Sequence, residues 1–156
     1  MENLRIKPLK LRKLKPIIYN PVILHKLDRF IDIYRIELNE KYTRIDFVTE
    51  PDIKRYVSGW WVNIHNTIYI KPADSYVKLP LVSVVNIPVA PAKYYFKNSK
   101  DIKAFTLYFP PLSKRTKSID IIENESSGSA WFNFYGIKLN TINKFIFAKI
   151  SIFGNN

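Results

Sequence analysis

The stretch at residues 104–139 constrains the fold most, because apolar and polar side chains alternate along it between clear turn signals. Phe105, Leu107 and Phe109 fall on every second position, which is the period of a strand that buries one face. The two prolines that follow have no N–H to donate to a β-ladder, so they end the strand. The pattern therefore predicts a strand whose apolar side chains face a core.

The same stretch predicts two further strands. Ile119 and Ile121 share one face of a strand at residues 118–123, and polar turn residues follow it. Residues 131–139 form the third predicted strand. Within it, Gly136 is expected to mark a β-bulge or a close approach of the backbone to a neighbour.

Further strand-like segments recur along the chain with turns between them. They are predicted at residues 34–38, 43–48, 60–64, 67–70, 76–85 and 93–96. Tyr34, Ile36 and Leu38 are expected on one face of their strand, and the segments on either side of His65 are expected to pair as a hairpin. Strands at intervals of about 8–12 residues are typical of a sandwich, so the sequence predicts an all-β fold.

Several segments carry a resemblance to a known family. FTLYFPPL at 105–112, TKSIDIIE at 116–123 and FNFYGIKL at 132–139 resemble the end of an immunoglobulin-like β-sandwich module of Bacteroidetes proteins. YRIEL at 34–38 and GWW at 59–61 also fit its pattern. That module often precedes a thioredoxin-like domain in exported thiol-disulfide oxidoreductases. The resemblance implies an immunoglobulin-like antiparallel β-sandwich, here stand-alone and without a signal peptide, and it implies no site residue.

We expect three parts in the chain. Residues 1–28 form a basic, extended N-terminal arm, residues 29–140 the sandwich, and residues 141–156 an apolar C-terminal extension. The extension is rich in Phe and Ile, so it is expected to be an added strand. Two arrangements stay open, one within this sheet and one in which the strand is offered to another subunit.

A strong positive charge is the main compositional feature. The chain has 25 Lys and Arg against 13 Asp and Glu, a formal net charge of +12. This charge favours nucleic acid, anionic lipid or an acidic protein surface as a partner, although an AT-rich genome also raises the lysine content. The predicted polyanion- or partner-binding residues are Arg5, Lys7, Lys10, Arg12, Lys13, Lys15, Lys114, Arg115 and Lys117.

Two adjacent tryptophans, Trp60 and Trp61, are candidate aromatic contacts. Neighbouring strand residues point to opposite faces, so one ring is expected in the core and the other against a loop, the arm or a partner. An exposed tryptophan near Lys54 and Arg55 suits base stacking or a protein contact.

The sequence contains no pattern that indicates catalysis or metal binding. It has no cysteine, which excludes disulfides, thiolate metal sites and cysteine nucleophiles. His25 and His65 are far apart in sequence, and no set of carboxylates at ligand spacing accompanies them. Asp120 and Glu123 fall on opposite faces of one strand and are expected to be ionised edge residues. We therefore predict no enzyme activity, no cofactor and no metal site.

The predicted function is a non-catalytic structural or interaction module. It is expected to dock into a larger assembly, a protein complex or a phage-particle-like structure, through its basic arm and terminal strand. One alternative is a sequence-independent RNA- or DNA-binding accessory subunit of a ribonucleoprotein. A second is an envelope module associated with a thiol-disulfide oxidoreductase.

The expected location is the cytoplasm, or a particle assembled there. The N-terminal residues lack the apolar core of a signal peptide, and no window approaches the length of a membrane span. The expected partners are proteins with an acidic surface, with nucleic acid and a second copy of the chain as open alternatives.

Overall fold

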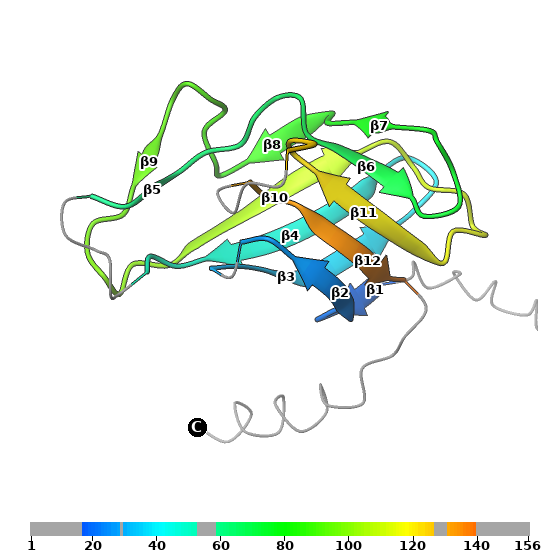
Figure 1. Ribbon diagram of the computed structural model, residues 1–156, viewed down its shortest axis with the longest axis horizontal. Helices are drawn as coiled ribbons and strands as arrows, with labels where there is room; N and C mark the ends of the chain where they lie inside the picture. The colour runs from blue at the N-terminus through cyan, green and yellow to red at the C-terminus, as the bar shows by residue number, and fades with distance from the viewer. Residues whose placement is uncertain (1–16, 29, 53–58, 127–130, 140–156) are drawn as a thin grey trace, which may run out of the picture.

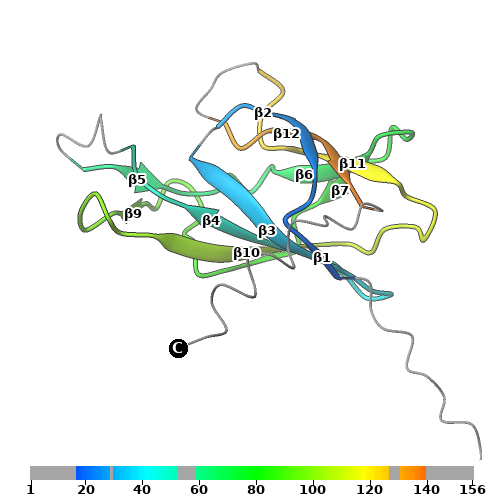
Figure 2. The same cartoon turned by 90° about the horizontal axis from the view of Figure 1, so that it is seen from below.

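The described part of this computed structural model is a β-sandwich. It covers residues 17–28, 30–52, 59–126 and 131–139. These residues form two antiparallel sheets of five strands each, packed face to face, and a separate two-stranded ribbon (Figures 1 and 2). The prediction of an all-β fold with the architecture of an antiparallel β-sandwich is confirmed.

The two sheets draw strands from all along the described chain. The first contains, in spatial order, β1 (Ile17–Tyr19), β3 (Ile31–Leu38), β4 (Thr43–Thr49), β10 (Lys103–Phe109) and β8 (Ser83–Val85). The second contains β2 (Ile23–Lys26), β12 (Phe134–Lys138), β11 (Ser118–Ile122), β6 (Tyr69–Pro72) and β7 (Leu79–Pro80). The ribbon pairs β5 (Trp61–Val62) with β9 (Tyr94–Tyr95).

The core lies between the two sheets and is centred on Phe47 of β4. The Phe47 ring stacks on Phe105 of the neighbouring strand β10, with ring centroids 5.0 Å apart. It also meets Phe134 of β12 in the opposite sheet at 5.9 Å. Isoleucine and leucine side chains fill the space around these rings. The fully buried ones include Ile36, Ile45, Ile70, Leu107, Ile119 and Ile137.

The chain changes sheets at both edges of the sandwich, from β1 to β2 and from β7 to β8. At the second crossing the Leu81 N–H donates to Ile68 O (3.1 Å) in the strand-β6 region, while the next residue, Val82, donates to Tyr108 O (2.8 Å) in β10. Residues 76–85, predicted as one strand-like run interrupted by proline, are therefore two short strands in different sheets.

Two predictions about the strands are wrong. The segments around His65 do not form a hairpin, because β5 pairs with β9 while β6 pairs with β11 and β7. Tyr34 does not share a face with Ile36, because β3 has a bulge between Ile33 and Arg35. Period-two counting fails across a bulge, so Tyr34 is exposed while Ile33 and Ile36 both face the core.

Gly136 lies at a bulge in β12, as its place in the sequence predicts. Tyr135 and Gly136 together face the single residue Asp120 of β11. The backbone φ of Gly136 is 64°, in the left-handed region that favours glycine, and its N–H donates to the Asp120 carboxylate at 2.8 Å. A Cβ at this position would lie 2.6 Å from Leu24 Cδ1 of the edge strand β2.

The outer face of the first sheet neutralises its own charges. Asp46 of β4 is 1% exposed and accepts hydrogen bonds from Arg35 Nη1 (3.1 Å) and Arg44 Nε (2.9 Å). The Thr106 hydroxyl donates to the same carboxylate at 2.6 Å, and Arg35 also pairs with Glu37 at 2.9 Å. Arg35 and Arg44 therefore pair with carboxylates of their own sheet.

We expect Phe47→Ala to lower the free energy of unfolding by about 3–5 kcal/mol, because it empties space that both sheets share. Val82→Ala is the matched control, since Val82 is exposed at an edge, and it should change the free energy by less than about 0.5 kcal/mol. Urea denaturation followed by tryptophan fluorescence measures both. Equal effects of the two substitutions would contradict the assignment of the core.

We expect Gly136→Ala to lower the free energy of unfolding by at least about 1–3 kcal/mol, the usual cost of a strained backbone conformation. The collision of the new Cβ with Leu24 adds to this cost. Because Leu24 is exposed, adding Leu24→Ala should relieve the contacts with Cδ1 and Cγ but not the contact with the Leu24 Cβ at 2.9 Å, so it should restore only a part of the lost stability. Full recovery in the double variant would show that the backbone at Gly136 is not strained.

Candidate functional site

All three tryptophans of the protein line one cleft with a volume of about 680 Å³. Trp60 and Trp61 come from the ribbon, and Trp131 lies just before β12. The other walls come from the ends of strands in both sheets. They include Leu27, Phe30, Thr49, Glu123 and Phe132. The cleft therefore opens at the end of the sandwich that carries the β5–β9 ribbon (Figure 1).

Hydrogen bonds explain why the segment holding β5 joins neither large sheet and forms this wall. The Ile64 N–H donates to Pro88 O (3.0 Å), and the side-chain amide of Asn63 donates to Ala92 O (2.9 Å). The Phe96 N–H donates to Trp60 O at 2.9 Å. The backbone around β5 is thus paired with residues 88–96, and β6 is left to pair with β11.

Each tryptophan ring has a different environment. Trp60 packs against the core, with its ring edge-to-face with Phe30 at 5.7 Å. Trp131 meets His65 edge-to-face at 5.2 Å. Trp61 points the other way and is 45% exposed, with Lys93 Nζ 4.1 Å from its ring centroid. One inward and one outward ring is the arrangement that the sequence predicts for the adjacent pair.

Glu123 is buried at the base of the cleft, although the sequence indicates an ionised edge residue. Its two carboxylate oxygens accept the backbone N–H groups of His65 (3.0 Å) and Phe132 (2.9 Å). Burial raises the pKa of Glu123, the two backbone N–H groups partly oppose this rise, and the charge of Asp28 adds to it. The carboxylate therefore ties two chain segments together, since each oxygen is already engaged.

The acidic and imidazole groups of the cleft form a small set. They are Asp28, His65 and Glu123, and Asp28 accepts the Phe30 N–H at 2.8 Å. In the described ranges, no group of three or more His, Asp or Glu side chains is placed to hold a metal ion. Aromatic rings dominate the remaining surface of the cleft, so the arrangement suits binding through ring contacts.

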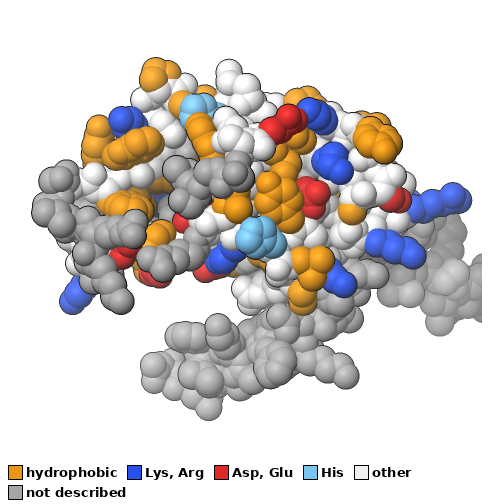
Figure 3. Space-filling model, viewed as in Figure 1, with side chains coloured by type: hydrophobic (Ala, Val, Ile, Leu, Met, Phe, Trp, Pro, Cys, Tyr) orange, Lys and Arg blue, Asp and Glu red, His pale blue; other side chains and the backbone are white. Residues whose placement is uncertain are grey.

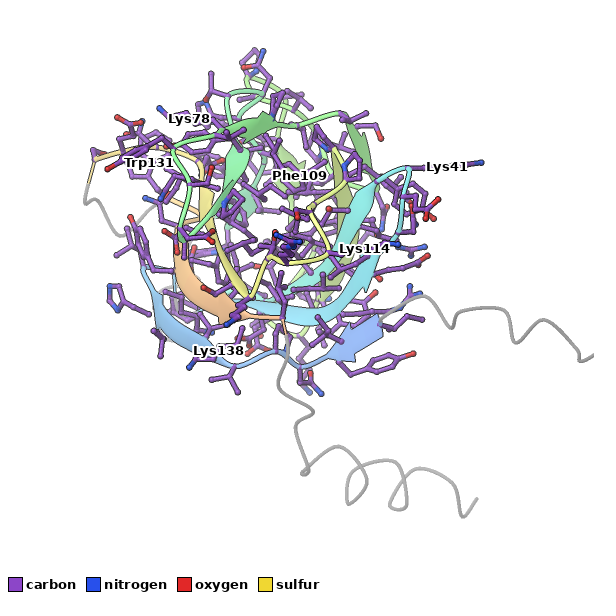
Figure 4. All side chains as sticks on the ribbon, turned by 90° about the vertical axis from the view of Figure 1, so that its right-hand side faces the viewer. Lys41, Lys78, Phe109, Lys114, Trp131 and Lys138 are labelled. Carbon is purple, nitrogen blue, oxygen red and sulfur yellow. The ribbon has the colours of Figure 1, made fainter. Side chains whose placement is uncertain are left out.

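The basic turn predicted at Lys114, Arg115 and Lys117 is a loop between β10 and β11. It lies at the opposite end of the sandwich from the ribbon, seen end-on in Figure 4 with Lys41, Lys114 and Lys138 at this end. Lys114 Nζ is 3.7 Å from Glu40 Oε1, and both side chains are exposed. The structure therefore does not bring this turn together with Trp60 and Trp61.

The predicted basic residues of the arm lie outside the described residues. They are Arg5, Lys7, Lys10, Arg12, Lys13 and Lys15. The whole of the predicted C-terminal extension, residues 141–156, is also outside them, whereas residues 17–26 of the predicted arm include the edge strands β1 and β2.

Most of the net charge falls outside the described residues. The described residues contain 14 Lys or Arg and 12 Asp or Glu, a net charge of +2. The other segments contain 11 Lys or Arg and one acidic residue, so they carry +10 of the total of +12. Six of these cations, with Glu2 as the single acid, belong to residues 1–16.

Sequence reasoning missed several residues that the structure places at this end. Trp131 and Glu123 join the cleft through tertiary contacts that no local pattern indicates. Lys93, Tyr95 and Lys97 did carry a signal, because they alternate with Tyr94 and Phe96 in the run KYYFK. The alternation identifies a basic and aromatic outer face, but its neighbour Trp61 is more than thirty residues away in sequence.

Comparison with known proteins adds nothing to the fold: no family model, curated protein or solved structure matches the chain. No helix of the length and hydropathy needed to cross a membrane occurs in the described ranges. The resemblance of the strand segments to the immunoglobulin-like module stays a prediction.

We expect Glu123 to make stability depend on pH. The unfolded side chain titrates near 4.5 and the folded one at a higher pH, so the folded state holds the proton more tightly. The stabilising contribution is full below 4.5 and is lost as the pH rises through the folded pKa. Urea denaturation across a pH series should show this loss in the wild type and not in Glu123→Gln.

Glu125→Gln is the matched control for this measurement. Glu125 is exposed, and its hydrogen bonds to Lys78 and Tyr69 lower its pKa, so its linkage has the opposite sign. The loss of stability with rising pH that is assigned to Glu123 should persist in Glu125→Gln. The same pH dependence in wild type and Glu123→Gln would contradict the assignment.

Proposed function

We propose that this protein is a non-catalytic binding module that docks into a larger assembly. In this proposal the sandwich is a rigid platform. Residues 1–16, the basic part of the N-terminal arm, attach it to an acidic surface. The C-terminal extension adds a strand across the interface. The function is thus divided between a folded body and the segments that flank it.

The observation that carries this proposal is the partition of charge. The described body is close to neutral, at +2, whereas the remaining segments carry +10. Arg35 and Arg44, the arginines of β3 and β4, are engaged by Asp46 and Glu37 within the sheet. An excess of positive charge in these segments attracts an acidic partner over long distances and speeds the encounter with it.

The edges of the sheets support a role for the extension. In the described topology, β1 and β8 end the first sheet, and β2 and β7 end the second. Such edges have unpaired backbone groups that can accept an additional strand. An apolar extension from one copy, paired with an edge of another protein, would bury both its side chains and its backbone polar groups.

Deleting Met1–Lys15 tests the role of the arm. We expect the variant to keep the free energy of unfolding of the full chain and to lose its partner in affinity purification at low salt. The matched control replaces Lys114, Arg115 and Lys117 with glutamine, which removes three cations from the loop between β10 and β11 and should leave the association intact.

Purification with and without nuclease, at low and high salt, identifies the class of partner. A partner that survives nuclease and is lost at high salt supports attachment to an acidic protein. Association that persists after the deletion contradicts the role of the arm. Loss of association in both the deletion and the glutamine variant would show that the arm is not specifically responsible for attachment.

A further inference from the structure

The outer surface of the β5–β9 ribbon combines aromatic rings with lysines. Trp61 of β5 pairs directly with Tyr95 of β9, so their side chains lie on the same side of the ribbon. Lys93 lies against the Trp61 ring, and the exposed Lys97 follows two residues after Tyr95, just past the end of β9. We call these four residues the ribbon face.

The rings of the ribbon face are open to solvent. Trp61 is 45% exposed and Tyr95 is 58% exposed, and both are large apolar side chains. Lys93 Nζ lies 4.1 Å from the centroid of the Trp61 ring, so a cation is held directly at the aromatic surface. Figure 3 shows hydrophobic side chains next to a basic one at the end of the molecule where Figure 1 places β5 and β9.

The inner surface of the ribbon holds this face in place. Val62 and Phe96 are buried, and Tyr94 packs edge-to-face on Phe96 with ring centroids 5.4 Å apart. The Tyr94 hydroxyl also donates to Asp101 at 2.8 Å, and Lys103 Nζ lies 4.1 Å from the Tyr94 ring. The exposed rings therefore stand on a packed support, which lowers the entropy lost when they bind a flat partner.

The charge around the ribbon face is positive, because its lysines outnumber the one carboxylate near them. Residues 93–103 contain four lysines and one acid, Asp101. Within the described part of the chain, no ion pair joins Lys93, Lys97 or Lys100 to a carboxylate. Asp101 instead accepts the Tyr94 hydroxyl and the Lys97 backbone N–H. These ammonium groups are thus available to an anionic ligand.

We propose that the ribbon face binds single-stranded nucleic acid. Bases would stack on Trp61 and Tyr95, while Lys93, Lys97 and Lys100 contact phosphates. Proteins that bind single strands without sequence preference use this combination of stacking rings and a positive surface. The ribbon face consists of described residues, so the inference does not depend on the proposed role of the arm.

Two features favour this partner over a protein or a duplex. Protein interfaces are enriched in arginine and depleted in lysine, whereas every cation of the ribbon face is lysine. A duplex keeps its bases stacked inside the helix, so it offers phosphates to the lysines but no base to the rings. The rings should therefore create a preference for single strands.

Fluorescence anisotropy of the full chain with labelled oligonucleotides of about 12 thymidines or uridines tests the proposal. Trp61→Ala and Tyr95→Ala should each weaken binding by about tenfold at fixed salt and reduce the preference for single strands over a duplex of equal length. Lys93→Gln and Lys97→Gln should each lower the slope of log affinity against log salt by about 0.7.

Matched controls lie at other places on the surface. Tyr76→Ala removes a fully exposed ring near the β6–β7 turn, and Lys41→Gln removes an exposed cation between β3 and β4. Neither should alter the preference for single strands. Thermal unfolding of each variant checks that the fold is kept, and Trp61→Phe should retain most of the affinity because it keeps a ring.

Three outcomes would overturn the proposal. One is the absence of oligonucleotide binding by the full chain. Another is equal affinity for duplex and single strand, which would assign binding to charge alone. The third is an unchanged preference for single strands in Trp61→Ala and Tyr95→Ala, together with competition by an acidic protein for Lys93 and Lys97. That result would assign the ribbon face to a protein partner.

Discussion

The structure depends on the contact that Phe47 makes across the two sheets. Its ring stacks on Phe105 in its own sheet and reaches Phe134 in the other, so it joins three strands through one buried side chain. A sheet that is apolar on one face is stable only when that face is covered. The short strands at the edges, and the ribbon at one end, add little burial of their own and rely on this central layer.

The tryptophan cleft arises where strands from both sheets end together. The chain leaves β4 at Thr49, returns at β5 and pairs there with residues 88–96 instead of with β6. This departure brings Trp60 and Trp61 to the cleft that Trp131 also lines. Glu123 then fixes the distance between the His65 and Phe132 segments through two backbone hydrogen bonds. A buried acid is costly unless it is hydrogen-bonded, and here the bonds stabilise the end of the sandwich.

Charge is distributed unevenly between the described residues and the rest of the chain. On the outer face of the first sheet, Asp46 draws Arg35 and Arg44 into a nearly buried network, so these cations support the fold. The lysines around Tyr95 have no such partner in the described residues, and the largest surplus of charge falls in the flanking segments. Most of the attraction that the protein can exert over longer distances therefore comes from residues other than the described ones.

The sequence by itself determined the all-β class, the strands at Phe105–Phe109 and Ile119–Ile121 and the bulge at Gly136, because each depends on local alternation or on one residue's backbone freedom. It also indicated that Trp60 and Trp61 would face opposite ways. Only the tertiary structure decided which strands pair, that Glu123 is buried, and that Trp131 lines the same cleft as Trp60. These features depend on contacts between distant segments, and a single bulge, such as the one at Tyr34, is enough to shift a face that local counting assigns.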